Sequence, residues 1–122
     1  MADKKIKILM IEDEPDIVEI YGWQIKNAGY DLTVTGNGRE SLDWLSKNTP
    51  SLVLLDLLMP DIDGYEFLDK IKNFSNRKKM LIYAWSNQTQ QKHIDLAKQK
   101  GVDGFLIKSD YTPKKLAEKV TE

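Results

Sequence analysis

Five polar side chains stand at the ends of apolar runs, and their types favour one kind of chemistry. They are Glu12, Asp13, Asp56, Ser86 and Lys108. Carboxylates that lie close together are unfavourable unless a cation neutralises them. Because the chain has no cysteine and a single histidine, oxygen ligands must suffice, and these suit Mg²⁺. A lysine and a hydroxyl beside such a site would stabilise an incoming phosphoryl group, which an aspartate could accept as an acyl phosphate.

Asp56 is the candidate nucleophile because of the residues around it. It follows Leu52–Leu55, an apolar run typical of a strand buried on both faces of a parallel sheet. A turn is predicted from Pro60 to Gly64. Open α/β sheets place their chemistry at the carboxyl ends of such strands. A lone aspartate at this position more often caps a turn, so the functional interpretation depends on the other four residues.

The elements that must position these residues alternate along the chain. Strands are predicted at 6–11, 32–35, 52–55, 80–85 and 104–107, and helices at 15–28, 42–45, 65–71, about 89–100 and 113–120. The helix at 89–100 has few apolar residues, so we expect it to be held weakly. The alternation implies a parallel sheet with helices on both faces. All five strand ends would then lie at one edge, and the three carboxylates would converge if the first and third strands are neighbours.

Length and composition predict one ordinary domain over residues 1–122. The formal net charge of −1 favours neither a nucleic-acid nor a membrane partner. A single histidine, His93, and the lack of cysteine exclude thiol chemistry and a multi-histidine metal site within one chain. No signal-peptide pattern or run of membrane-spanning length is present. The expectation is a soluble, cytoplasmic domain.

Together, the strand ends resemble the receiver domain of two-component response regulators, the family of the chemotaxis protein CheY. The matching residues are Glu12-Asp13, Asp56 with Met59-Pro60-Asp61 and Asp63-Gly64 behind it, Ser86 and Lys108. The resemblance covers essentially the whole chain. It implies an α/β, flavodoxin-like, doubly wound fold: a five-stranded parallel sheet in the order 2-1-3-4-5, with five helices.

The resemblance also assigns roles to individual residues. Asp56 would accept phosphate from a histidine kinase or a histidine phosphotransfer protein. The implied Mg²⁺ ligands are the carboxylates of Glu12, Asp13 and Asp56 and the backbone carbonyl of Leu58. Ser86 and Lys108 would each bind a phosphoryl oxygen. Such a domain is mainly a signalling switch that catalyses its own phosphorylation and dephosphorylation.

The output implied by the resemblance is a change of shape. Phe105 is expected in the core because its side chain is large and apolar, and it occupies the position of the family's aromatic switch residue. The fourth helix, fifth strand and fifth helix would repack after phosphorylation and dock to a downstream protein, a fused output domain or a second copy. The chain is either a receiver that works alone or one part of a longer regulator.

Three residues depart from the family pattern. Ser109 stands where a proline after a cis bond is usual, and because a cis bond to another residue costs about 2.5–4 kcal/mol, we expect a trans bond here. Asn87 replaces a small residue and is expected to narrow access to the site. Leu58 is apolar where many relatives are polar and is expected to shield an acyl phosphate from water. We therefore predict slow loss of phosphate.

Other functions fit the sequence less well. A pseudo-receiver, an interaction module that is never phosphorylated, is supported only by Asn87 and Ser109. A phosphatase of the haloacid-dehalogenase type needs Asp-x-Asp after its first strand, whereas here Leu58 takes the place of the second acid after Asp56. A flavin-binding flavodoxin needs a loop rich in Ser, Thr and Gly where this chain has acids.

Overall fold

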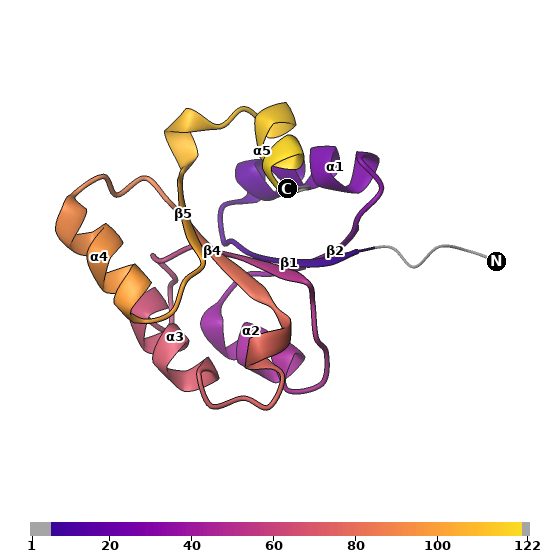
Figure 1. Cartoon of the computed structure of the whole chain (residues 1–122). Coiled ribbons are helices and arrows are strands. Elements are labelled where there is room, and N and C mark those ends of the chain that lie inside the picture. The colour runs from indigo at the N-terminus through magenta and orange to yellow at the C-terminus, as the bar shows by residue number, and fades with distance from the viewer. Residues whose placement is uncertain (1–5, 121–122) are drawn as a thin grey trace.

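The computed structural model describes residues 6–120, which fold around a five-stranded parallel sheet (Figure 1). The strands are β1 (Lys7–Ile11), β2 (Asp31–Thr35), β3 (Leu52–Leu55), β4 (Leu81–Ser86) and β5 (Gly104–Ile107). Their order is β2-β1-β3-β4-β5, which confirms the predicted order. The register pairs Ile11 of β1 with Leu55 of β3. Because those two strands end side by side, the residues that follow them, Glu12 and Asp56, are brought together.

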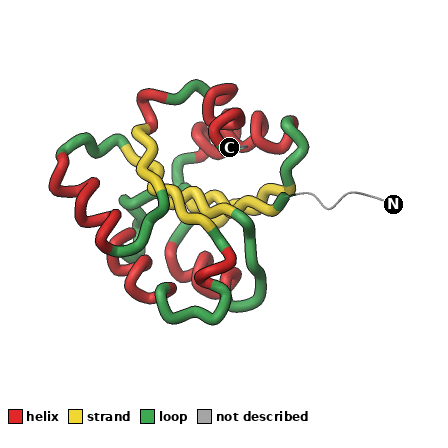
Figure 2. Tube along the Cα trace, in the orientation of Figure 1, coloured by secondary structure: helices red, strands yellow, loops and turns green. Residues whose placement is uncertain are grey.

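Five α-helices cover the two faces of the sheet (Figure 2). They are α1 (Pro15–Asn27), α2 (Gly38–Leu45), α3 (Gly64–Ile71), α4 (Gln91–Gln99) and α5 (Pro113–Lys119). Figure 1 shows α1 and α5 on one side of the sheet and α2, α3 and α4 on the other. The structure confirms the predicted alternation of strands and helices. Within residues 6–120, no helix combines the length and the apolar character needed to cross a bilayer.

The core has two layers because the side chains of a strand alternate between the faces of the sheet. Ile8 and Met10 of β1 join the cluster under α1 and α5. Leu9 and Ile11 join the cluster under α2, α3 and α4. All four are buried, so this central strand is covered on both faces. In α4, by contrast, only Ala97 is fully buried, which agrees with the weakly held helix that its polar sequence predicts.

The structure differs from the sequence-based prediction in two short turns and in the burial of one side chain, features that hydrophobic periodicity does not predict. Two short 3₁₀ turns, Arg77–Lys79 and Lys108–Asp110, lie between the predicted strands and helices, where no regular element was predicted. Phe105 was expected in the core, but its side chain is only half-buried against the α2–α4 cluster. The reason is that β5 lies at the edge of the sheet.

Gly64 allows α3 to begin directly against the loop that follows Asp56. Its N–H donates to the carbonyl of Leu57 at 3.0 Å. A Cβ at position 64 would lie 2.6 Å from Leu57 Cα and 2.8 Å from that carbonyl oxygen. We therefore expect Gly64→Ala to lower the free energy of unfolding by about 1–3 kcal/mol, as overpacking does. Urea unfolding measures this effect.

Gly36 provides the matched control, because a Cβ there would have no heavy atom within 4 Å. Gly36→Ala is expected to change the unfolding free energy by less than about 0.5 kcal/mol, as surface substitutions usually do. Equal stability of the two variants would show that the backbone around Leu57 yields easily, contrary to this expectation.

Candidate functional site

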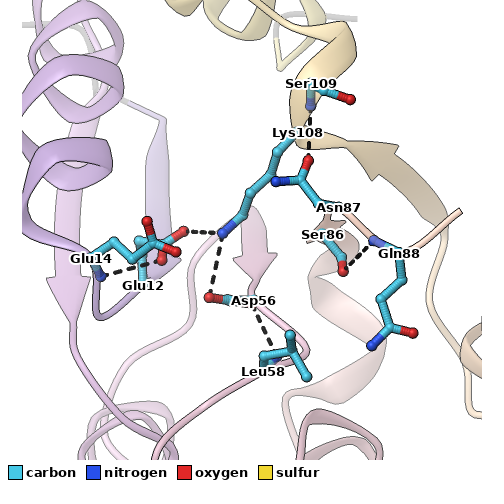
Figure 3. A network of polar contacts seen from close by, with 9 residues as sticks. All are labelled: Glu12, Glu14, Asp56, Leu58, Ser86, Asn87, Gln88, Lys108 and Ser109. Atoms are coloured by element: carbon cyan, nitrogen blue, oxygen red, sulfur yellow. Dashed lines mark hydrogen bonds and ion pairs between the residues drawn. The ribbon is translucent and has the colours of Figure 1, made fainter.

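The predicted site residues meet at the carboxyl edge of the sheet (Figure 3). A pocket of about 190 Å³ lies there. Its walls are Asp13, Glu14, Asp56, Leu58, Ser86, Asn87 and Lys108. Glu12 contacts the ammonium of Lys108, so all five side chains singled out by type and position are brought together.

Lys108 joins the two buried carboxylates. Its Nζ lies 2.8 Å from Glu12 Oε1 and 3.4 Å from Asp56 Oδ2. The exposed fractions of these residues are only 8% for Lys108, 2% for Glu12 and 4% for Asp56. Burial by itself would lower the pKa of Lys108, but the hydrogen bond to Glu12 and the charge of Asp56 outweigh it and raise that pKa. Lys108 is therefore an ammonium at neutral pH.

Lys108 compensates the buried carboxylate of Glu12 only in part. Burial raises its pKa from 4.5 to about 7, and the charge of Asp56 adds to the rise, although the hydrogen bond from Lys108 opposes both. One lysine thus compensates the acidic cluster only in part. A divalent cation would supply the missing positive charge.

The acidic cluster fits the ligand preferences of Mg²⁺. Glu12, Asp13 and Asp56 each offer a carboxylate oxygen, and these three oxygens lie within 4.8 Å of one another. Asp13 is exposed, so an ion could enter from the pocket side. Leu58 donates its N–H to Asp56 Oδ1 at 2.9 Å. This bond holds the backbone at Leu58, whose own carbonyl was predicted as a further ligand. A small number of carboxylates with the remaining positions left to water is the usual Mg²⁺ environment.

The raised pKa of Glu12 makes stability depend on pH. Between the unfolded pKa of 4.5 and the folded pKa of about 7, the folded protein binds more protons than the unfolded chain. In EDTA, the free energy of unfolding is therefore expected to fall by up to about 3 kcal/mol as the pH rises through this window. Urea unfolding at a series of pH values measures the slope.

Glu12→Gln should abolish most of that pH dependence, because glutamine has no proton to lose. The exposed neighbour Glu14 supplies the control, and Glu14→Gln should keep the wild-type slope. A wild-type slope in Glu12→Gln would assign the dependence to another group.

Ser86 is buried at the end of β4 and faces the same pocket. Its Oγ accepts a hydrogen bond from the N–H of Gln88 at 3.1 Å. Because Oγ acts there as an acceptor, its own O–H can still donate to a ligand.

The three residues that depart from the family pattern have different surroundings. The described residues include no cis peptide bond, so the expected trans bond between Lys108 and Ser109 is confirmed. Leu58 lines the pocket, yet 64% of it is exposed. Asn87 also lines the pocket, and its Oδ1 accepts a hydrogen bond from the N–H of Ser109 at 3.0 Å. The slow loss of phosphate stays a prediction.

Sequence reasoning missed two features of this site. Glu14 was not among the predicted site residues, but it lines the pocket, and its N–H donates to Glu12 Oε2 at 3.3 Å. The Asn87–Ser109 hydrogen bond was also missed. A signal existed, because Ser109 keeps the N–H that a proline would lack and Asn87 carries a side-chain acceptor.

Comparison with known proteins agrees with this geometry. A family model described as "Response regulator receiver domain" matches residues 8–121. The chain is 33% identical over 112 residues to the nitrate/nitrite response regulator protein NarL of Escherichia coli K12, a match that covers 89% of this chain and 50% of NarL. It is 30% identical over 118 residues to the probable transcriptional regulator ycf27 of Porphyridium aerugineum, covering 96% of this chain and 47% of that protein. The chain thus spans about half the length of these relatives.

Solved structures show the same fold. The chemotaxis response regulator CheY4 of Vibrio cholerae superposes with a TM-score of 0.89 over 97% of this chain and 98% of its own, at 24% sequence identity. Fold, carboxyl-edge residues and family match therefore agree, and the chain belongs to the response regulator receiver domain family.

Proposed function

We propose that this chain is the phosphoacceptor domain of a two-component system and that Asp56 receives the phosphoryl group. The observation that carries the proposal is the Lys108 ammonium, which lies 3.4 Å from the Asp56 carboxylate at a pocket that Ser86 also lines. An anion entering this pocket would meet a fixed positive charge and a hydroxyl donor next to a buried nucleophile.

The proposed donor is a histidine kinase or a histidine phosphotransfer protein in the cytoplasm. An oxygen of the Asp56 carboxylate bonds to phosphorus while the phosphorus–nitrogen bond of the donor's phosphohistidine breaks, and the released imidazole takes up a proton. Lys108 stabilises negative charge on the transferred group, and the O–H of Ser86 donates to another of its oxygens. Mg²⁺ bound by Glu12, Asp13, Asp56 and the Leu58 carbonyl would supply further charge neutralisation.

The proposed output is a rearrangement of the face formed by α4, β5 and α5. Half-buried Phe105 on the edge strand and the weakly anchored α4 support this assignment, since both can move at low cost. Residues 1–122 would then act as one receiver domain that docks to a downstream protein or a fused output domain, or that pairs with a second copy. We assign it no nucleic-acid or membrane partner of its own.

Intact-mass spectrometry after incubation with acetyl phosphate tests the proposal. With Mg²⁺ we expect one phosphoryl adduct on the intact chain, because the Asp56 carboxylate displaces acetate from phosphorus. In EDTA we expect no adduct. If folded protein acquires no adduct in either condition, the proposal fails and the chain is a pseudo-receiver.

A further inference from the structure

A hydrogen bond joins the residues that directly follow Ser86, at the end of β4, and Lys108, just past the end of β5. Asn87 directly follows Ser86, and Ser109 directly follows Lys108. The Asn87 side-chain carbonyl accepts from the Ser109 N–H at 3.0 Å, across a gap of 22 residues in the chain (Figure 3). The bond therefore connects the immediate neighbours of both side chains assigned to the phosphoryl group.

This bond extends the sheet beyond its last strand pair. The final pair in the β4–β5 register is Ser86 with Ile107. Past that pair, the chain turns into the 3₁₀ segment Lys108–Asp110, which is closed by a hydrogen bond from the Tyr111 N–H to the Lys108 carbonyl at 3.2 Å. The Asn87 side chain supplies the acceptor for the N–H of Ser109, one residue beyond Lys108.

Lys108 depends on such an anchor because its ammonium sits at the end of a flexible four-carbon chain. The Nζ must reach Glu12 on the end of β1 and Asp56 on the end of β3 from the edge strand β5. A shift of the backbone at 108 away from β3 and β1 would draw the Nζ away from both carboxylates.

We propose that Asn87 is a positioning residue that holds Lys108 in place through the Ser109 amide. The two unusual residues are complementary: the backbone N–H at 109 is the donor, and the carboxamide at 87 is the acceptor. Any displacement of the loop at Ser86 is then passed to Lys108. The effect on phosphoryl transfer rests on the proposed function, whereas the hydrogen bond can be tested without it.

Three substitutions separate the acceptor from the bulk of the side chain. Asn87→Leu keeps the approximate shape and removes the acceptor, Asn87→Ala removes both, and Asn87→Asp keeps an oxygen acceptor. Asn87 is exposed, so none of them threatens the core. The first measurement is hydrogen exchange of the Ser109 amide by NMR. The exchange rate should be about twofold to tenfold higher in Asn87→Leu and Asn87→Ala, because each loses one hydrogen bond of the usual strength. In Asn87→Asp it should stay near the wild-type rate.

The second measurement is the rate of phosphorylation by acetyl phosphate at saturating Mg²⁺. In both Leu and Ala variants the rate should fall about threefold or more, while Mg²⁺ affinity stays at the wild-type value and the melting temperature falls by no more than the few degrees that the loss of one hydrogen bond causes. A role limited to structure would lower the melting temperature and leave the rate unchanged. If Ala changes the rate and Leu does not, the side chain acts by its bulk and the proposal is overturned.

Two further outcomes are decisive. Faster Ser109 exchange with unchanged phosphorylation rates would show that the bond exists but does not position Lys108, which also overturns the proposal. If the wild-type protein itself acquires no phosphoryl group, the proposed function fails. In that case unchanged Ser109 exchange in the Leu and Ala variants would overturn the anchoring role separately.

Discussion

Asp56→Asn is expected to abolish the phosphoryl adduct completely. The asparagine amide lacks the negative charge and the nucleophilic oxygen that an acyl phosphate requires. The substitution should leave the local fold intact, because an amide oxygen can still accept the N–H of Leu58 that Asp56 Oδ1 accepts. Intact-mass spectrometry with acetyl phosphate and Mg²⁺ gives the result directly.

Asp63 offers the matched control for this substitution. It is exposed, and its Oδ1 accepts the Tyr65 N–H at 2.7 Å as the N-cap of α3. Asparagine caps helices about as well as aspartate, so Asp63→Asn should acquire the adduct at the wild-type rate. An adduct that persists in Asp56→Asn would mean that another carboxylate, such as Asp13, is the acceptor.

Lys108→Met should reduce the phosphorylation rate by about a hundredfold to a thousandfold, the usual cost of removing one preorganised donor from developing negative charge. Methionine is similar in length to the aliphatic stem of lysine but lacks the ammonium. Mg²⁺ affinity should not weaken, because Lys108 is a cation that competes with the metal for Glu12 and Asp56. A Mg²⁺ titration followed by tryptophan fluorescence therefore separates loss of the charge from damage to the metal site.

Lys114→Met is the control for this experiment, since Lys114 is exposed on α5. It should phosphorylate at the wild-type rate. A loss of less than about tenfold in Lys108→Met would contradict the role that the proposed mechanism gives to this ammonium.

The sequence predicted those strands and helices whose pattern of apolar residues reflects which side chains are buried. Leu52–Leu55 is apolar throughout because both faces of β3 are covered, and this pattern located Asp56 at the end of the strand. The half-burial of Phe105 was not predictable in this way, since apolar composition does not distinguish an edge strand from a central one. For the Asn87–Ser109 bond, the residue types signal a backbone donor at 109 and a side-chain acceptor at 87, but they do not show that the two loops bring these groups together.

The Lys108–Glu12 ion pair has a further consequence for how the protein is made. It joins residues 96 positions apart in the chain, so it closes a loop that spans most of the domain. Such distant contacts form only after the entropy of closing the intervening chain has been overcome. During synthesis, Glu12 and Asp56 leave the ribosome well before Lys108. A nascent or truncated chain that ends before β5 therefore carries the proposed acceptor, Asp56, without the Lys108 ammonium. Under the proposed function, we expect such a chain not to be phosphorylated until Lys108 is in place.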